Sequence, residues 1–197
     1  AIPQNRIGYY APLLSLFYTQ LFHFLLDDDL YKKNSLPVYC LLDEFAHLSI
    51  PHFSSIITTT RARRVSLSIV LQSLSQLEER YGKHGANTIL NGGCASQVFF
   101  SGMDTDTARM LRETLGEVSV ETLLVNGQFR RDKEPLMTTA AIRSMADNEV
   151  IYLYGNKRPM KLQLTPYYEQ NDLLRRTQTA YRPPKIAPLS AVCYVPI

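Results

Sequence analysis

Apolar residues recur at helical spacing near the start of the chain, within residues 9–26. The recurring side chains are Leu13, Leu16, Phe17, Leu21, Phe24 and Leu25. Spacings of three and four residues place such side chains on one face of a helix. Pro12 suits the first turn of that helix, because an N–H there would have no intrahelical partner. The pattern predicts a largely buried helix whose first turn contains Pro12.

Apolar runs of strand length come next along the chain. Residues 37–42 show no polar alternation, which predicts a central strand covered on both faces. Residues 65–71 alternate between apolar residues and serine and end at Gln72, which predicts a second strand. The remaining expected strands are residues 96–100, 149–155 and 160–164.

Helices are expected between these strands. Ser73 and Asp104 are residue types that cap helices, and Gly82 and Gly116 are typical of helix ends. The helices predicted on this basis are residues 53–61, 73–81, 85–90, 104–115 and 138–145.

The alternation of helices and strands predicts an α/β fold with a mainly parallel sheet and flanking helices. Residues 118–133 interrupt it, because they alternate around the turn signal Asn126-Gly127. We expect a hairpin or exposed excursion there, with a basic tip at Arg130 and Arg131. Residues 169–197 contain four prolines and little periodicity, which predicts a tail that packs on a partner or stays loose.

The composition is that of a globular protein, with 45% hydrophobic and 20% charged residues among 197. No uninterrupted apolar run reaches the roughly 18 residues that a membrane span needs. The net charge of +3 permits nucleic-acid binding without arguing for it, since Lys and Arg are mostly scattered. The three cysteines lie far apart, which disfavours a disulfide framework or a zinc site.

The strongest chemical motif is the acidic pair Asp43-Glu44, which follows directly on the apolar run at residues 37–42. The carboxyl end of a parallel strand delivers side chains to the crevice where α/β proteins bind ligands. There the first carboxylate can hold Mg²⁺ through water, and the second can orient or deprotonate an attacking water. This is the Walker B pattern of nucleotide hydrolases. The alternative is a solvated acidic end on a buried strand.

Two polar features near the second strand are weaker signals. Gln72 follows that strand, where an amide can sense a γ-phosphate or merely precede a helix cap. Arg61, Arg63 and Arg64 lie just before the strand. An arginine there can stabilise phosphoryl charge in a neighbouring subunit's site or meet a DNA phosphate. The alternative is a solvated basic turn.

The complementary phosphate-binding motif is missing, because no GxxxxGK[ST] sequence (Walker A) occurs in the chain. An acidic pair without that loop is half a nucleotide site. The chain begins with Ala1 and shows no signal-peptide pattern, so we expect it to continue a longer protein that carries the other half. The histidines have no metal-ligand spacing and are interpreted as local hydrogen-bonding groups; they are His23, His47, His52 and His84.

Together these segments resemble the motor domain of type IV secretion coupling proteins, the TraG/TraD-like family. The matching segments are LLDEFAHL at 41–48, TTRAR at 59–63, LQSLSQL at 71–77, ANTILN at 86–91, QVFFSG at 97–102, DTDTA at 104–108, PLM at 135–137 and residues 149–168. The resemblance runs in order over residues 7–168. Matches in this order are far more specific than any one motif.

The resemblance implies a RecA-like P-loop NTPase core, of which residues 1–168 are the C-terminal portion and residues 169–197 a Pro-rich tail. It implies ATP and Mg²⁺ as cofactors and a homo-hexamer anchored in the bacterial inner membrane, on the cytoplasmic face. Such proteins bring relaxase–DNA complexes or effector proteins to the inner-membrane components of a type IV secretion channel.

The resemblance also implies site residues. They are Asp43 as the Mg²⁺-side acid, Glu44 as the catalytic carboxylate, Gln72 as the sensor, and Arg61, or else Arg63, as the arginine that acts on a neighbouring subunit. Thr60 and Arg64 replace glycines of the family pattern, so the turn before the second strand is expected to differ.

Two functions stay open at this point. The first is a motor enzyme with DNA-stimulated ATP hydrolysis, which the retention of both acidic residues favours. The second is a non-catalytic recruitment platform for effector or relaxosome proteins, with the tail and residues 118–133 as docking surfaces. A packaging or chromosome-translocating ATPase shares the fold but not the detailed matches. We predict that this chain alone does not hydrolyse ATP, because it has no Walker A motif.

Overall fold

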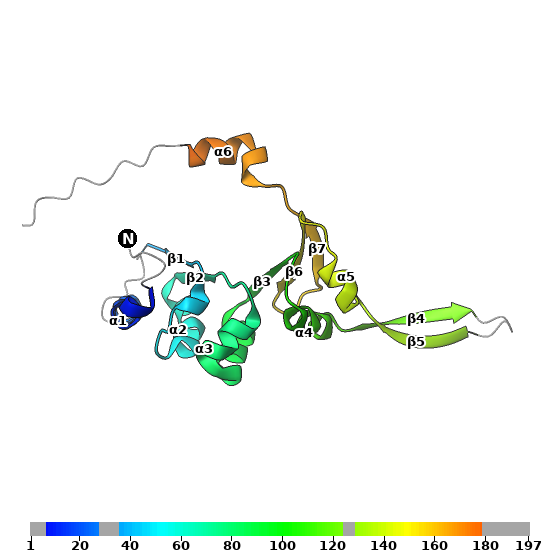
Figure 1. The fold of residues 1–197 in the computed structure, drawn as a ribbon, viewed down its shortest axis with the longest axis horizontal. Helices are drawn as coiled ribbons and strands as arrows, with labels where there is room; N and C mark the ends of the chain where they lie inside the picture. The colour runs from blue at the N-terminus through cyan, green and yellow to red at the C-terminus, as the bar shows by residue number, and fades with distance from the viewer. Residues whose placement is uncertain (1–6, 28–35, 124–128, 179–197) are drawn as a thin grey trace, which may run out of the picture. The chain divides into compact units, whose positions relative to one another are not determined.

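The computed structural model describes residues 7–27, 36–123 and 129–178 (Figure 1). The chain divides into two compact units, residues 1–163 and 164–197. The first unit contains two hydrophobic cores, each of which lies against its own small sheet.

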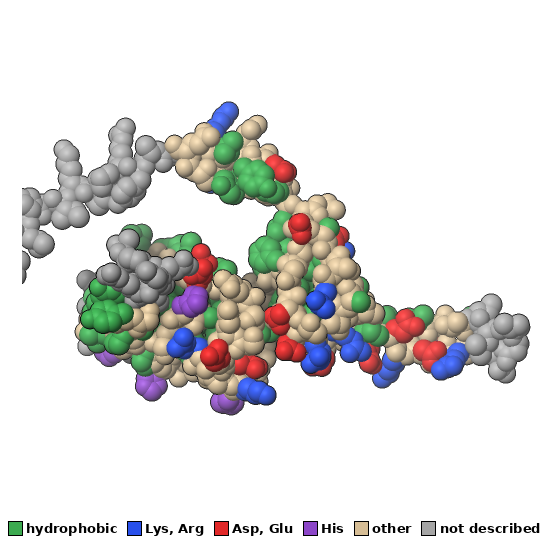
Figure 2. All heavy atoms as spheres, in the orientation of Figure 1, with side chains coloured by type: hydrophobic (Ala, Val, Ile, Leu, Met, Phe, Trp, Pro, Cys, Tyr) green, Lys and Arg blue, Asp and Glu red, His purple; other side chains and the backbone are tan. Residues whose placement is uncertain are grey.

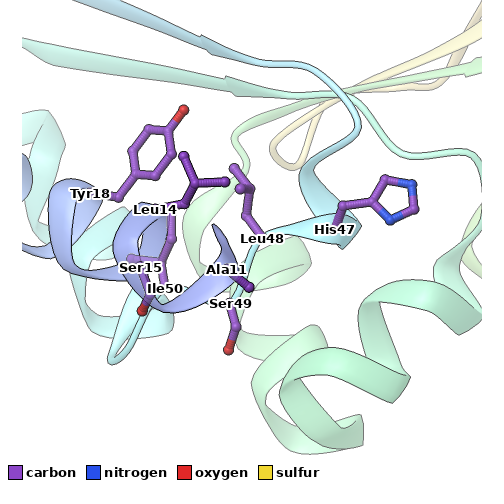
Figure 3. A pocket seen from close by; sticks show the side chains of 8 residues that line it. All are labelled: Ala11, Leu14, Ser15, Tyr18, His47, Leu48, Ser49 and Ile50. Carbon is purple, nitrogen blue, oxygen red and sulfur yellow. The ribbon is translucent and has the colours of Figure 1, made fainter. Parts of the chain in front are cut away.

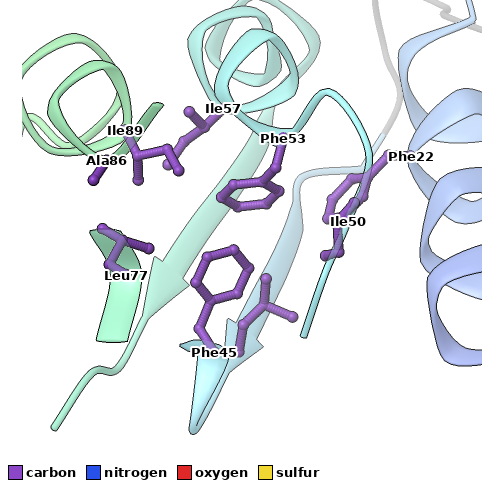
Figure 4. Close-up of a cluster of buried hydrophobic side chains, with 9 residues drawn as sticks. Phe22, Phe45, Ile50, Phe53, Ile57, Leu77, Ala86 and Ile89 are labelled. Atoms are coloured by element: carbon purple, nitrogen blue, oxygen red, sulfur yellow. The ribbon is translucent and has the colours of Figure 1, made fainter. Parts of the chain in front are cut away.

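The first core lies against a parallel pair of strands, β1 (Val38–Leu42) and β2 (Val65–Ile69), which pair along their whole length. The helices of this region are α1 (Ile7–Leu26), α2 (Phe53–Thr59) and α3 (Leu74–Asn87). Figure 4 shows apolar side chains from α1, α2, α3 and the segments that connect the elements of this region pointing toward one another. The buried members are Phe22, Leu42, Phe45, Ile50, Phe53, Ile57, Leu77, Ala86 and Ile89.

The second core lies against an antiparallel sheet of strand order β3, β6, β7. The strands are β3 (Ser96–Phe100), β6 (Glu149–Tyr154) and β7 (Met160–Gln163). The helices of this region are α4 (Thr105–Leu115) and α5 (Thr139–Arg143). The buried side chains are Ala108, Leu111, Ile142, Met145 and Ile151.

Helix ends in both cores follow from local chemistry. The Ser73 side chain caps α3 by accepting from the Gln76 amide at 3.4 Å, as the sequence predicts. Gly82, at φ 69° and ψ 161°, breaks α3 internally at the predicted stop. The Asp104 side chain caps α4 by accepting from the amides of Asp106 and Thr107. These sequence signals are therefore confirmed.

A two-stranded hairpin interrupts the second region, formed by β4 (Glu117–Leu123) and β5 (Phe129–Pro135). This confirms the predicted excursion, although the Asn126-Gly127 turn lies outside the described residues. Ion pairs line the hairpin: Arg131 Nε lies 2.6 Å from Glu121 Oε1, and Arg130 Nε lies 2.9 Å from Asp132 Oδ1. Figure 2 shows charges of both signs along this segment.

Short helical turns connect the main elements. In the first unit they are η2 (Phe45–His47), η3 (Thr60–Arg63) and the π-helical η4 (Thr88–Gly93). In the second unit, η5 (Tyr167–Glu169) precedes α6 (Asn171–Thr177), a helix that the sequence analysis does not predict. The rest of the expected Pro-rich tail, residues 179–197, lies outside the described residues.

Three predictions for α1 and β1 are wrong: the position of Pro12, the burial of α1 and the covering of β1 on both faces. The helix α1 already includes Ile7, so Pro12 lies inside it and not in its first turn. One stripe of α1 is exposed and apolar, namely Tyr9, Leu13, Leu16, Phe17 and Phe24. Strand β1 is covered on one face only, since Tyr39 and Leu41 are 73% and 79% exposed. The apolar pattern of the sequence therefore includes side chains that the described residues leave exposed.

The predicted mainly parallel sheet is not confirmed. The pair β1–β2 is parallel, whereas β3, β6 and β7 pair antiparallel, as do β4 and β5. The physical reason is local. The turn at Gly155 and Lys157 folds β7 straight back on β6, and a turn this short allows only antiparallel pairing. The fold is mixed α/β.

Candidate functional site

The acidic pair forms a strained turn directly after β1. Glu44 has left-handed backbone angles, φ 49° and ψ 40°. A residue other than glycine in this conformation costs on the order of 1–3 kcal/mol and persists only where its surroundings fix it. The Glu44 amide donates to Asp43 Oδ1 at 2.9 Å, and the side chain of Asp43 is exposed. The turn thus presents a carboxylate to solvent at the carboxyl end of β1.

Parallel pairing brings Gln72 to the same end of the sheet. The Val70 amide donates to the Leu42 carbonyl at 3.0 Å, and the Phe45 amide donates to the Val70 carbonyl at 3.1 Å. These two bonds bracket the acidic pair and place it beside the segment that leads to Gln72. Gln72 itself is exposed, between the end of β2 and the start of α3. The structure therefore brings three of the predicted site residues to one edge.

The predicted arginine lies at the other end of the same strands. Arg61 is exposed in η3, before β2 begins. The Val38 amide donates to the Arg64 carbonyl at 3.0 Å, which fixes this turn at the start of β1. A strand of five residues spans roughly 15 Å. Within one chain, Arg61 and the acidic pair are therefore separated by the length of the strands, so the structure does not bring Arg61 to the edge that holds the acidic pair.

Arg64 stands where the family pattern has glycine, and its backbone conformation reflects this. Arg64 has φ 56° and ψ 27°, the left-handed conformation that glycine adopts most easily. Thr60, at the other departure, is buried and donates its hydroxyl to the Ile57 carbonyl at 3.1 Å. The turn keeps a conformation suited to glycine although it carries an arginine.

Sequence reasoning missed two residues that contact the acidic turn. Arg80 and Tyr81 project from α3 and donate hydrogen bonds to the backbone that follows Glu44. Burial raises the pKa of Tyr81, although the Ile50 amide and Arg80 act in the opposite direction. The available signal was the spacing of Leu77 and Tyr81, which puts the tyrosine on the buried face of α3.

The Asp104–Thr107 motif has a structural role. Burial opposes ionisation of Asp104, but hydrogen bonds from the Thr107 hydroxyl and from the amides of Thr107 and Asp106 outweigh it, so the pKa of Asp104 lies below 3.8. The Leu74 amide donates to the Thr107 hydroxyl oxygen at 3.5 Å. This bond ties the start of α3, beside Gln72, to the start of α4.

A small cavity lies beside the acidic turn, between α1 and the segment His47–Ile50. Figure 3 shows it lined by Leu14 and Tyr18 from one side and by Leu48 and Ile50 from the other. Its volume of about 10 Å³ has room for one water at most. This cavity cannot hold a nucleotide.

Two absences hold for the described residues. Within 7–27, 36–123 and 129–178, no three His, Cys, Asp or Glu side chains gather into a metal-binding group. Over the same part of the chain, no helix has the length and apolar character to cross a bilayer.

Comparison with known proteins gives one consistent family. The family described as the TraM recognition site of TraD and TraG matches residues 37–147, more than half of the chain. Protein VirD4 of Rhizobium rhizogenes is 27% identical over 186 residues, which cover 89% of this chain and 27% of VirD4.

Solved structures agree with this match. The bacterial conjugative coupling protein TrwBdeltaN70 superposes with a TM-score of 0.69 at 25% identity, over 82% of this chain and 39% of that chain. The plasmid coupling protein TrwB in complex with a non-hydrolysable ATP analogue superposes with a TM-score of 0.67 at 25% identity. The match covers 82% of this chain and 38% of that chain. The chain therefore spans 27% of VirD4 and well under half of TrwB. It belongs to the TraG/TraD family of type IV coupling proteins and corresponds to their C-terminal part.

Proposed function

We propose that this chain is the C-terminal portion of the nucleotide-binding motor domain of a type IV coupling ATPase. The whole protein uses ATP hydrolysis to deliver DNA–protein or protein substrates to the secretion channel. One observation carries the proposal: Asp43, Glu44 and Gln72 come together at the carboxyl ends of a parallel strand pair. That is the edge at which α/β proteins bind nucleotides.

The edges of the sheets support completion by another segment. Among the described residues, β2 pairs with β1 alone and β3 pairs with β6 alone, so each has an edge without a partner strand. Tyr39 and Leu41 on β1 are apolar and exposed, as expected of a strand that is covered in the complete domain. A strand carrying the Walker A loop, placed against β2, would complete a RecA-like, mainly parallel sheet beside the acidic turn.

The proposed roles follow from position. Asp43, an exposed carboxylate at this edge, suits Mg²⁺, which is usually bound by one or two carboxylates together with water and phosphate oxygens. Bound there, Mg²⁺ would neutralise phosphate charge. Glu44 orients the attacking water and accepts its proton. Gln72 senses the γ-phosphate, and Arg61 serves the site of the next subunit in a homo-hexamer.

The partners are proposed from the family. TrwB was solved with an ATP analogue, which supports ATP as the nucleotide. The family description names TraM recognition, which supports contact with relaxosome or effector proteins. We place the whole protein at the cytoplasmic face of the bacterial inner membrane, with the other inner-membrane components of the secretion system. DNA is a further candidate partner, and a net charge of +3 does not decide for it.

The proposal is tested by ATP hydrolysis of the full-length protein that contains this chain, with and without single- and double-stranded DNA. We expect turnover that DNA stimulates, and its loss in Glu44→Gln. Glu134→Gln, on the exposed hairpin, is the matched control and should keep wild-type turnover. The isolated 197-residue chain should be inactive, and turnover by it that Glu44→Gln abolishes would contradict the half-site account.

A second candidate is a recruitment platform in which hydrolysis is secondary or lost. The family description of a TraM recognition site and the exposed charged hairpin β4–β5 favour it. Slow turnover that is indifferent to DNA and to Glu44→Gln would support this candidate. Binding of relaxosome or effector proteins, lost when the hairpin is shortened, would then define the function.

A further inference from the structure

We propose that Arg80 and Tyr81 of α3 are positioning residues that hold the Glu44 carboxylate in place and link it to Gln72. The inference rests on the proposed ATPase function and extends it to residues outside the acidic motif. Neither residue belongs to a nucleotide-binding motif. Both are identified by the contacts that α3 makes with the segment directly after the strained turn.

Tyr81 fixes the chain after Glu44 by two hydrogen bonds through one hydroxyl. Its Oη donates to the Leu48 carbonyl at 3.1 Å and accepts from the Ile50 amide at 3.1 Å. Its ring stacks on Phe45, with centroids 5.5 Å apart and an interplanar angle of 3°. Phe45 is fully buried and immediately follows Glu44. Tyr81 therefore contacts the first residue of η2 and fixes the backbone that follows η2.

Arg80 adds a third hydrogen bond to the same segment. Its Nε donates to the Ala46 carbonyl at 3.2 Å. Together the two neighbouring side chains engage backbone groups of Ala46, Leu48 and Ile50, all within six residues of Glu44.

These contacts matter because Glu44 is strained. Its left-handed backbone is closed by the His47 amide, which donates to the Glu44 carbonyl at 3.0 Å. A side chain other than glycine keeps this conformation only when the residues around it are fixed. If the turn relaxes, the carboxylate moves, and a displacement of about 1 Å can reduce catalysis by up to roughly 100-fold.

The same helix segment begins at the sensor. Ser73, next to Gln72, caps α3, and Gly82 interrupts the helix directly after Tyr81. Residues 74–81 thus form a short uninterrupted helical segment. Gln72 lies just before its start, and Arg80 and Tyr81 lie at its end. A movement of Gln72 would displace this helical segment. The displacement would reach the turn that carries Glu44 through Tyr81. We infer that γ-phosphate sensing and placement of the catalytic carboxylate are coupled in this way.

The test compares Tyr81→Phe with wild type in the full-length protein. The variant keeps the ring stacking and removes the two hydrogen bonds. We expect kcat for ATP hydrolysis to fall about 10-fold with KM unchanged, since the carboxylate is misplaced while nucleotide contacts stay. Tyr152→Phe is the matched control. Its hydroxyl lies 3.2 Å from Ser96 Oγ in the second sheet, and its loss should leave both constants unchanged.

Two further variants keep the test decisive. Arg80→Met retains the apolar stem and loses the donor, and a several-fold fall in kcat is expected. In a Gln72→Ala background, Tyr81→Phe should have little further effect, because coupled residues are not additive. Amide exchange at Ile50 should accelerate in Tyr81→Phe while that at Val70 does not.

The outcomes separate the two claims. An inactive wild-type protein overturns the proposed function and this inference with it. An active protein in which Tyr81→Phe and Arg80→Met keep the wild-type kcat overturns the inference alone. Effects of Gln72→Ala and Tyr81→Phe that simply add would overturn the link to the sensor.

Discussion

The two cores of the first unit treat unusual backbone conformations differently. In the first region, the described positive-φ positions are Gly82 and three residues other than glycine, namely Glu44, His52 and Arg64. In the second region, the described positive-φ positions fall at glycines, namely Gly102, Gly116 and Gly155. Strain of this kind gathers at functional sites and requires supporting contacts. The first region therefore needs supporting contacts at Glu44, where we propose the catalytic carboxylate, whereas glycines adopt the corresponding conformations in the second region at little cost.

The side chains that pack the two regions also differ. The first region is packed around an aromatic cluster. The ring centroids of Phe45 and Phe53 lie 4.4 Å apart, and the Phe45 ring stacks on Tyr81. The buried core of the second region consists, among the described residues, of aliphatic side chains and a methionine, namely Ala108, Leu111, Ile142, Met145 and Ile151. We therefore expect a loss of packing in the aromatic cluster to displace the turn that carries Glu44, which Phe45 directly follows.

The largest effect is expected from Phe45→Ala. Phe45 is 0% exposed and lies at the centre of the aromatic cluster. Removing it should lower the free energy of unfolding by about 3–5 kcal/mol, because a cavity remains. Phe100→Ala, at a ring 58% exposed, should cost far less. Urea unfolding of both variants measures the difference, and equal losses would remove the proposed role of the aromatic cluster.

Gly93→Ala should have the next largest effect. A Cβ at this position would lie 2.5 Å from Ile57 Cγ2, a branched and buried side chain. Overpacking of this kind costs about 1–3 kcal/mol. At Gly92 a Cβ would meet nothing closer than 3.7 Å, so Gly92→Ala is the control. Matching thermal unfolding midpoints for the two variants would show that the first core is loosely packed.

Asp104→Ala should cost about 1–2 kcal/mol through loss of the α4 cap. The pKa of Asp104 is lower in the folded state than its ordinary 3.8, so unfolding takes up protons as pH falls. Its stabilisation is therefore complete above about pH 4–5 and is lost as pH falls through the folded-state pKa. Unfolding curves at pH 7 and pH 3 should differ less for Asp104→Ala than for wild type. An equal difference would mean that another group controls acid stability.

The smallest effect is expected from Arg64→Gly, which should stabilise the protein by roughly 0.5–1 kcal/mol by releasing left-handed strain. Gly116→Ala, at φ 75° in the second region, should act in the opposite direction by a similar amount. Differential scanning calorimetry of the two variants compares them directly. Destabilisation by Arg64→Gly would show that the arginine side chain contributes more than the strain it imposes.

Local elements could be predicted from sequence because their signals are local. The strand at residues 96–100, the cap at Asp104, the break at Gly82 and the excursion at 118–133 all follow from residue type and spacing. Burial could not be predicted, because apolar residues such as Tyr39 and Leu41 mark surfaces that the described residues do not cover.

The site was partly predictable for the same reason. Asp43 directly follows β1 and Gln72 comes three residues after β2, and parallel pairing then brings them to one edge. The separation of Arg61 also follows, since it precedes the strand that Gln72 follows. Tyr81 was not foreseen, because its two hydrogen bonds reach residues more than 30 positions earlier in the chain.

The central claim is that the strained turn after β1 carries the catalytic carboxylate. The most direct test is single-turnover ATP hydrolysis by the full-length protein, comparing wild type, Glu44→Gln and Glu149→Gln. Glu44→Gln should bind ATP normally and hydrolyse it about 100- to 10,000-fold more slowly, as expected for loss of a general base. Glu149→Gln, in the second region, should match wild type. Hydrolysis by Glu44→Gln at the wild-type rate would contradict the account.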